Sequence, residues 1–194
     1  MKKLDSSYWN NHYLNNNTGW DLGYASPPIT DYFDQVDNKK LKILIPGAGK
    51  AWEAEYLWKK GFRNVYVLDY SQEAISEFEE RVPEFPKSQI IIEDFFKLEG
   101  GFDIIVEQTF FCSLSLELRS SYVSQMNTLL KPKGKLIGLL FNHKFKFQGP
   151  PYGGTPQFYK ELFHEHFEFT IFEIAHNSIK PRAKREHFCI FTKK

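Results

Sequence analysis

A turn rich in glycine, followed along the chain by an acidic residue, could bind the ribose of an adenosine. An apolar run over residues 41–45 ends in the turn 46–49, and a second apolar run over 65–68 ends in Asp69. Glycine lets a ligand approach the backbone, and a carboxylate can accept hydrogen bonds from ribose hydroxyls. Gly47, Gly49 and Asp69 are therefore predicted to form an adenosine-binding site.

The composition of this turn limits the cofactor. In the dinucleotide fingerprint G-x-G-x-x-G/A, a third small residue allows helix and strand to pack closely around the pyrophosphate turn. Trp52 occupies that position here, and the turn lacks the G-K-[ST] ending of a phosphate-binding P-loop. S-adenosylmethionine, which has adenine and ribose but no phosphate, fits better. A tight turn without a ligand is the alternative interpretation.

Two further acidic residues follow or end apolar runs. Asp94 comes after the run 89–93 and precedes Phe95, so the carboxylate could accept from an adenine amino group while the ring covers the base. Asp94 could instead cap its own turn. Glu107 ends the run 102–107, where a carboxylate is costly without a partner. The ammonium of the cofactor, or a lysine or backbone partner, would meet that need.

Aromatic residues before the first strand suggest a cover for the cofactor. Trp9 and Tyr13 are neighbours on one helix face, and Trp20 follows in a loop. These rings either belong to the core or form a lid over the sulfonium, a cation that aromatic faces attract.

Other chemistry-bearing residues have weaker patterns. His143 follows the run 135–141 and could act as a base or lie on the surface. His164 and His166 do not share a helix face, so we expect no metal site. A basic segment is interpreted as a solvated loop, because no aromatic residues alternate with its cations as in a nucleic-acid site. It contains Lys180, Arg182, Lys184 and Arg185.

Alternating strands and helices are expected to position these residues. Strands are predicted at 41–45, 65–68, 89–93, 102–107, 135–141, 167–175 and 187–192, and helices at 7–16, 30–36, 51–60, 72–82, 116–130 and 155–166. This α/β alternation predicts a parallel sheet with helices on both faces, ending in a hairpin. Ligands bind such sheets at the carboxyl ends of the strands, which is where the turn and the acidic residues stand.

Length and composition exclude several classes of protein. The 194 residues suit one domain, 1–194, in which residues 1–36 form the lid segment. A net charge of +1 creates no field for nucleic acid or a membrane surface. Cys112 and Cys189 lie in apolar runs and are expected to be reduced core residues. Without a signal peptide or membrane span, we expect a cytoplasmic protein, and a monomer.

Several motifs resemble the thiopurine methyltransferase family, and in particular its plant thiol and halide methyltransferase branch. They extend in order from about residue 8 to residue 152. The similar segments are Tyr8-Trp9, Trp20-Asp21-Leu22-Gly23-Tyr24-Ala25-Ser26-Pro27, Ile45-Pro46-Gly47-Ala48-Gly49, Leu68-Asp69-Tyr70-Ser71, Glu93-Asp94-Phe95-Phe96, Phe110-Phe111-Cys112, Leu130-Lys131-Pro132-Lys133-Gly134 and Gly149-Pro150-Pro151-Tyr152.

This resemblance implies a Rossmann-like class I methyltransferase fold, with a seven-stranded, mostly parallel sheet, one antiparallel strand and an N-terminal helical lid. It also implies that a set of aromatic, glycine and acidic or amide residues binds S-adenosylmethionine. The expected cofactor-binding residues are Trp9, Tyr13, Trp20, Gly47, Gly49, Asp69, Tyr70, Asp94, Phe95, Glu107 and Gln108.

Some positions depart from the family pattern. Tyr13 stands where the plant branch has tryptophan, and Gln108 stands where relatives have tyrosine or arginine after the acid. Tyr152 matches a tyrosine that borders the acceptor pocket, so Tyr152 and His143 are the candidates for that pocket. DNA amino-methyltransferases also contain Pro-Pro-Tyr, but there it follows Asp or Asn, whereas Gly149 precedes it here.

The expected reaction is an in-line displacement on the sulfonium methyl by a small soft nucleophile: a thiol, hydrosulfide, thiopurine or halide. A thiol has a reference pKa near 8.5, so a thiolate fraction exists at neutral pH and no general base is assigned. Two alternatives remain: an O- or N-methyltransferase of another small metabolite, and a non-catalytic module that binds S-adenosylmethionine.

Overall fold

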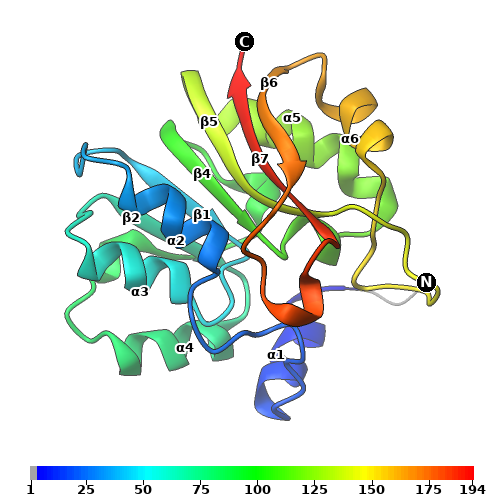
Figure 1. The fold of residues 1–194 in the computed structure, drawn as a ribbon. Coiled ribbons are helices and arrows are strands. Elements are labelled where there is room, and N and C mark those ends of the chain that lie inside the picture. Colours follow the sequence, from blue (N-terminus) through cyan, green and yellow to red (C-terminus); the bar gives the residue numbers. More distant parts are fainter. Residues whose placement is uncertain (1–3) are drawn as a thin grey trace.

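A seven-stranded sheet forms the centre of the computed structural model, which describes residues 4–194 (Figure 1). Its strands are β1 (Ile43–Pro46), β2 (Val65–Asp69), β3 (Ile90–Ile92), β4 (Phe102–Gln108), β5 (Leu130–Phe141), β6 (Phe167–Ile174) and β7 (Glu186–Lys193). Their order is β3-β2-β1-β4-β5-β7-β6. Only β7 is antiparallel to its neighbours, which confirms the predicted architecture.

Helices connect the strands in the predicted alternation. They are α1 (Ser6–Leu14), α2 (Pro27–Asp34), α3 (Trp52–Lys59), α4 (Gln72–Arg81), α5 (Arg119–Leu129) and α6 (Pro156–Phe163). Short 3₁₀ turns complete the connections: η1 (Lys87–Gln89), η2 (Phe95–Lys97), η3 (Phe111–Ser113), η4 (Leu116–Leu118) and η5 (Lys180–Arg182).

The core lies in two layers, one on each face of the sheet. Successive strand residues point to opposite faces, so Ile43 and Ile45 pack in one layer and Leu44 in the other. Helices α2, α3 and α4 contribute Phe33, Leu57 and Phe78 to the first layer. Helices α5 and α6 fill the second layer, with Tyr122 and Phe163 among their buried residues. Both faces are covered, as the near-continuous apolar strands require.

Several predicted boundaries differ from the structure, and three of them bear on how the elements pack. The helix predicted at 116–130 begins as the 3₁₀ turn η4, and α5 starts only at Arg119. Strand β5 begins at Leu130 rather than Lys135, because Leu130 is buried and pairs with Phe102 at the start of β4. Helix α2 also begins early, at Pro27. Proline suits a first helical turn because its missing N–H would have no intrahelical partner there.

Helix α1 lies below the sheet in Figure 1, beside the β6–β7 connection, whereas α2 packs on the face of the sheet. Side chains join α1, and Leu4 just before it, to the two residues between β2 and α4. Ser71 donates to Asn10 Oδ1 at 2.7 Å, and the hydroxyl of Tyr70 donates to the carbonyl of Leu4 at 2.5 Å. The first three residues of the expected lid segment, 1–36, lie outside the described residues.

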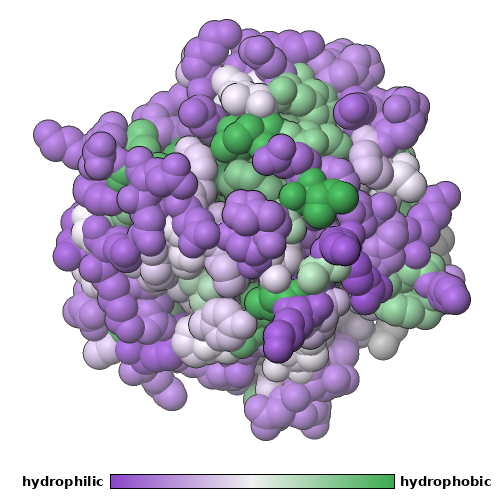
Figure 2. All heavy atoms as spheres, viewed as in Figure 1, coloured by the Kyte–Doolittle hydropathy of each residue, from purple (hydrophilic) through white to green (hydrophobic). Residues whose placement is uncertain are grey.

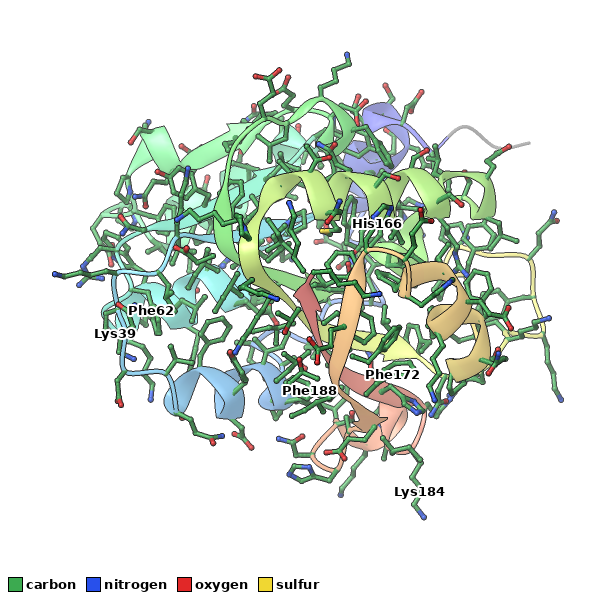
Figure 3. The ribbon with its side chains drawn as sticks, turned by 90° about the horizontal axis from the view of Figure 1, so that it is seen from above. Lys39, Phe62, His166, Phe172, Lys184 and Phe188 are labelled. Atoms are coloured by element: carbon green, nitrogen blue, oxygen red, sulfur yellow. The ribbon has the colours of Figure 1, made fainter. Side chains whose placement is uncertain are left out.

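The molecular surface in Figure 2 is mainly hydrophilic, with hydrophobic residues gathered in small groups. Some lysines also cover rings at the surface: the Nζ of Lys39 lies 4.1 Å from the centre of the Phe62 ring (Figure 3). Across residues 4–194, no helix has the length and apolarity needed to cross a bilayer. Cys112 and Cys189 are both buried free thiols, as predicted.

Candidate functional site

A cavity of about 1830 Å³ opens where β1, β2 and β4 end. Its wall also includes α1, the loop after α1, and the β5–α6 and β6–β7 connections. The cavity exceeds the 300–1,000 Å³ range typical of small-molecule sites, so a nucleoside cofactor and a small acceptor can share it. Tyr152 lines it, together with ten of the predicted cofactor residues: Trp9, Tyr13, Trp20, Gly47, Gly49, Asp69, Tyr70, Asp94, Phe95 and Gln108.

The turn after β1 requires glycine at two positions. Gly47 and Gly49 have φ angles of +57° and +55°, in the left-handed region that favours glycine. A Cβ at Gly47 would lie 2.2 Å from the Phe110 ring, and one at Gly49 would lie 2.6 Å from the hydroxyl of Tyr13. The turn therefore brings backbone close to two aromatic side chains that line the cavity, with no room for a larger residue.

Asp69 fixes this turn from the end of β2. Its Oδ2 accepts a hydrogen bond from the Gly49 amide at 2.9 Å, and its Oδ1 accepts from the Ser71 amide at 2.8 Å. Burial raises the pKa of the Asp69 carboxyl, while the bonds from these amides oppose that shift. A carboxylate has about four acceptor sites. Asp69 therefore retains capacity to accept from ligand hydroxyls in the cavity.

Asp94 and Phe95 line the cavity next to the end of β3. Asp94 caps η2, because its Oδ1 accepts from the amide of Phe96 at 3.0 Å. The capping interpretation considered for Asp94 thus describes its local role, and the residue still faces the cavity. The Phe95 ring packs edge-on against that of Phe110, with 5.1 Å between ring centres. Asp94 and Phe95 thus provide a hydrogen-bond acceptor and an apolar ring at the same part of the cavity wall.

The aromatic residues of the N-terminal segment form a cluster over the cavity. Trp9 and Trp20 meet edge to face at 5.4 Å between ring centres, and Tyr13 meets Trp20 at 6.0 Å. Trp9 and Trp20 keep part of their surface exposed, whereas Tyr13 is only 7% exposed. Tyr13 thus belongs to the core as well as to the cavity wall. The role of these rings as a lid over the cofactor stays a prediction.

Three hydrogen bonds, two from α3 and one from the β6–β7 connection, hold the loop after α1. Trp52 donates through Nε1 to Asp21 at 2.7 Å, and the amide of Ser26 donates to Glu53 at 2.9 Å. From the β6–β7 connection, Arg182 donates to the carbonyl of Trp20 at 2.7 Å. The position of the aromatic cluster is therefore set by both α3 and the C-terminal hairpin.

Glu107 differs from its expected role, because it does not line the cavity. It is 1% exposed and lies in the core, where Oε2 accepts from the Tyr122 hydroxyl at 2.5 Å. Its Oε1 accepts from the amides of Phe110 and Phe111 at 2.8 and 2.9 Å. These partners within the protein replace the expected cofactor ammonium. Burial raises the pKa of the Glu107 carboxyl to about 7.

Gln108, the next residue of β4, does line the cavity. Its Oε1 is buried and has no hydrogen-bond partner among the described residues. Because adjacent strand residues point to opposite sides, Gln108 and Glu107 cannot both face the same space. Gln108 therefore provides a hydrogen-bond acceptor that a bound molecule could satisfy.

The two candidates for the acceptor pocket lie in different environments. Tyr152 lines the cavity, whereas His143 does not. The Nε2 of His143 lies 2.9 Å from a guanidinium nitrogen of Arg185. Burial, and next the charge of Arg185, lower the pKa of His143. His143 therefore lies behind the cavity wall, in contact with Arg185 and with the Phe145 ring at 4.7 Å between ring centres, rather than in the cavity where a base would act.

Sequence reasoning missed several residues of the cavity wall near Tyr152. Phe141 and Phe145 provide rings there, and Arg182 and Arg185 also line the cavity. Arg185 is exposed, as expected of a solvated loop, whereas Arg182 is half-buried and departs from that interpretation. Arg182 forms an ion pair with Glu186 at 3.5 Å. Lys184, by contrast, points outward from the β6–β7 connection (Figure 3). A basic loop sequence does not reveal which of its cations fold back over a site.

Comparison with known proteins gives matches to methyltransferases. A family model described as thiopurine S-methyltransferase matches residues 4–193. A "Probable thiol methyltransferase 2" of Arabidopsis thaliana is 29% identical over 167 residues, covering 84% of this chain and 74% of the relative. A "Thiocyanate methyltransferase 1" of the same plant is 30% identical over 156 residues, covering 78% and 68%.

Solved structures share the fold at low sequence identity. The 1,6-didemethyltoxoflavin-N1-methyltransferase of Burkholderia thailandensis, solved with S-adenosylhomocysteine, has a TM-score of 0.79 at 16% identity and covers 98% of this chain and 87% of that one. A TehB-like S-adenosylmethionine-dependent methyltransferase from Corynebacterium glutamicum has a TM-score of 0.67 at 20% identity, covering 97% and 98%.

Proposed function

Since the chain belongs to the thiopurine S-methyltransferase family, we propose that it transfers a methyl group to a small soft nucleophile. It is an S-adenosylmethionine-dependent methyltransferase. The proposed acceptor is a thiol, hydrosulfide, thiopurine or halide. The observation that carries the proposal is one cavity lined both by the Gly47–Asp69 pair and by the aromatic and cationic wall around Tyr152.

In this proposal the cofactor occupies the half of the cavity nearest β1, β2 and β3. Asp69 accepts from the ribose hydroxyls, and Asp94 with Phe95 holds the adenine. The partnerless Oε1 of Gln108 suits the ammonium of the methionine part. When bound, S-adenosylmethionine supplies a methyl group already activated by the sulfonium. The surrounding faces of Trp9 and Trp20 favour that cation.

The acceptor occupies the half nearest Tyr152. Phe141 and Phe145 make this wall apolar, and Arg182 and Arg185 add positive charge. Apolar rings favour the loss of water from a small anion, and the positive charge of the arginines attracts the anion. The nucleophile forms a bond to the methyl carbon as the carbon–sulfur bond of the sulfonium breaks. Holding the two reactants in line can contribute several kcal/mol to lowering the barrier.

The chain's own residues need not remove a proton from such an acceptor. His143 lies outside the cavity wall, and the Cys112 thiol, which lines it, has its pKa raised by burial to about 12. A thiol with a reference pKa near 8.5 is partly ionised at neutral pH. The protein's role in this proposal is therefore positioning and desolvation.

We further propose a cytoplasmic monomer that does not act on nucleic acid. Two buried free thiols suit a reducing compartment. All the residues of the proposed site come from one chain, which supports a monomer. A net charge of +1 provides no broad attraction for polyanions.

A panel of acceptors tests the proposal. Purified protein is incubated with S-adenosylmethionine and, separately, hydrosulfide, an aromatic thiol, a thiopurine, iodide, a catechol and an amine, and release of S-adenosylhomocysteine is measured. We expect turnover with sulfur acceptors and iodide. Turnover with the catechol or the amine alone would instead identify an O- or N-methyltransferase. Cofactor binding without turnover on any acceptor would favour the non-catalytic module.

A further inference from the structure

The guanidinium of Arg119, the first residue of α5, is a buried cation behind the acceptor half of the cavity. Arg119 is 3% exposed. Its Nη1 donates to the carbonyl of Gly153 at 3.0 Å, and its Nη2 donates to the carbonyl of Tyr152 at 2.9 Å. The two terminal nitrogens of the guanidinium therefore each donate a hydrogen bond to one of two successive backbone carbonyls. Its Nε is buried and has no hydrogen-bond partner among the described residues.

No carboxylate neutralises this charge within the described part of the chain. The titratable groups acting on Arg119 are Tyr152, Tyr159 and Cys112. Two rings lie near the cation instead: its central carbon is 4.5 Å from the centre of Phe111 and 5.4 Å from that of Phe158. Burying a cation without a carboxylate is costly. The interactions gained in return are those with the two carbonyls and the rings.

The carbonyls belong to residues 149–154, which we term the acceptor loop because Tyr152 borders the proposed acceptor. Two further contacts fix it. The amide of Tyr152 donates to the carbonyl of Cys112 at 2.6 Å. A Cβ at Gly153 would lie 1.8 Å from the carbonyl oxygen of His143, so the loop passes very close to the end of β5. These contacts fix the backbone of the acceptor loop at the wall of the cavity.

We propose that Arg119 is a positioning residue for the methyl acceptor, because it fixes Tyr152 at the cavity wall through the backbone of the acceptor loop. The inference rests on the proposed function, in which Tyr152 borders the acceptor. Arg119 itself does not line the cavity, so it acts through the loop. The cofactor half of the cavity is held by other contacts, those of Asp69 and the turn after β1. Removing the guanidinium should therefore affect the acceptor and spare the cofactor.

Two variants distinguish the effect of the paired hydrogen bonds of Arg119 from the effect of its positive charge. Arg119→Met keeps an apolar stem but loses the charge and its donors, and Arg119→Lys keeps the charge while losing the two-armed geometry. Arg63→Met is a control for the loss of an arginine elsewhere: Arg63 is exposed, donates to a backbone carbonyl and covers the Trp58 ring away from the cavity. For each variant, the Kd of S-adenosylhomocysteine and kcat and KM for hydrosulfide and an aromatic thiol are measured.

We expect Arg119→Met to lower kcat/KM for hydrosulfide about tenfold or more, since charge-assisted hydrogen bonds are lost, with the Kd of S-adenosylhomocysteine changed less than about twofold. The aromatic thiol should lose less, because a loosened wall makes room for a ring. Arg119→Lys should lie between Arg119→Met and the wild type, and Arg63→Met should match the wild type. Equal losses for both thiols and the cofactor would overturn the inference.

Amide hydrogen exchange provides a readout that does not depend on turnover. In Arg119→Met, or in Arg119→Lys if the first variant does not fold, the peptide covering the acceptor loop should exchange faster than in the wild type. The peptide covering the Gly47 turn should be unchanged. Unchanged exchange in the loop would refute the positioning role. Failure of the proposed function would appear differently, as absent turnover by the wild-type enzyme on every soft nucleophile.

Discussion

The amide of Gly49 donates a 2.9 Å hydrogen bond to Oδ2 of Asp69 and thereby joins the turn after β1 to the end of β2. The two residues lie at the carboxyl ends of adjacent parallel strands, where open α/β sheets bind ligands. Asp69 thus shapes the backbone that a ligand approaches and offers the same ligand its remaining lone pairs. In the proposed function, this one carboxylate links the stability of the turn to the affinity for the cofactor.

Replacing Asp69 should weaken cofactor binding. Asp69→Ala removes the acceptor for the Gly49 amide and for the ribose hydroxyls, so we expect the Kd of S-adenosylmethionine to rise about tenfold or more. Calorimetric titration measures this Kd. Asp103→Ala is the control, because Asp103 also accepts from a backbone amide, that of Lys42 at 2.7 Å, but lies away from the cavity. Equal affinities in Asp69→Ala and the wild type would show that Asp69 does not contact the ribose.

The close approach at Gly47 can be separated from its backbone strain. Gly47→Ala places a methyl group against Phe110, whereas Gly61→Ala places one in open space at a φ of +88°. Both substitutions strain the backbone by about 1–2 kcal/mol. Only Gly47→Ala should also displace the Phe110 ring and reduce cofactor affinity, by about tenfold or more. Thermal melts and cofactor titrations of both variants test this, and a Gly47→Ala protein with wild-type affinity would argue against a tight turn.

Trp20 should contribute to affinity for the cation of the cofactor. Trp20→Ala removes one aromatic face, at a cost of about 1–2 kcal/mol for a desolvated cation, or about tenfold in Kd. Trp58→Ala is the control, since Trp58 is also a partly buried tryptophan but packs against Phe85 outside the cavity. Comparison with S-adenosylhomocysteine, which has no sulfonium, isolates the charge. If Trp20→Ala weakened the binding of both ligands equally, the ring would contribute contact area only and no attraction for the sulfonium charge.

Glu107 should make stability depend on pH. Its pKa is about 7 in the folded protein, raised by burial from an ordinary value of 4.5. The folded state therefore binds its proton more tightly than the unfolded state does. The resulting stabilisation is present below about pH 4.5 and is lost as the pH rises through about 7.

Glu107→Gln removes this titration. Between pH 5 and pH 8, the free energy of unfolding of the wild type should fall relative to that of Glu107→Gln by up to a few kcal/mol, at about 1.4 kcal/mol for each pKa unit. Denaturant unfolding at several pH values measures both proteins. A difference between them that stays constant with pH would mean that Glu107 is not a titrating buried group.

Local patterns were sufficient to predict the sheet and much of the cavity wall. Buried parallel strands are short apolar runs that are easily recognised in a sequence. Ligands bind at the carboxyl ends of such strands, where Gly47 follows β1 and Asp69 ends β2. For Gly47 and Asp69, the position at a strand end was enough to predict that the residue lines the cavity.

The direction of a side chain at a strand end depends on register and packing, which local patterns do not contain. Glu107 and Gln108 are consecutive, yet Glu107 points into the core and only Gln108 lines the cavity. Long-range folding placed the other missed residues: Arg182 reaches the carbonyl of Trp20 across 162 positions, and Arg119 reaches Gly153 across 34. A single sequence read by local spacing gives no signal for such contacts.

The most direct test of the proposed chemistry identifies the product of a competition. Wild-type protein is given S-adenosylmethionine with an isotope-labelled methyl group and a mixture of hydrosulfide, an aromatic thiol, iodide, a catechol and an amine. We predict labelled methanethiol, methyl aryl sulfide or methyl iodide, with a total amount of transferred label equal to that of the S-adenosylhomocysteine released. Label found only on the catechol oxygen or the amine nitrogen would contradict transfer to a soft nucleophile.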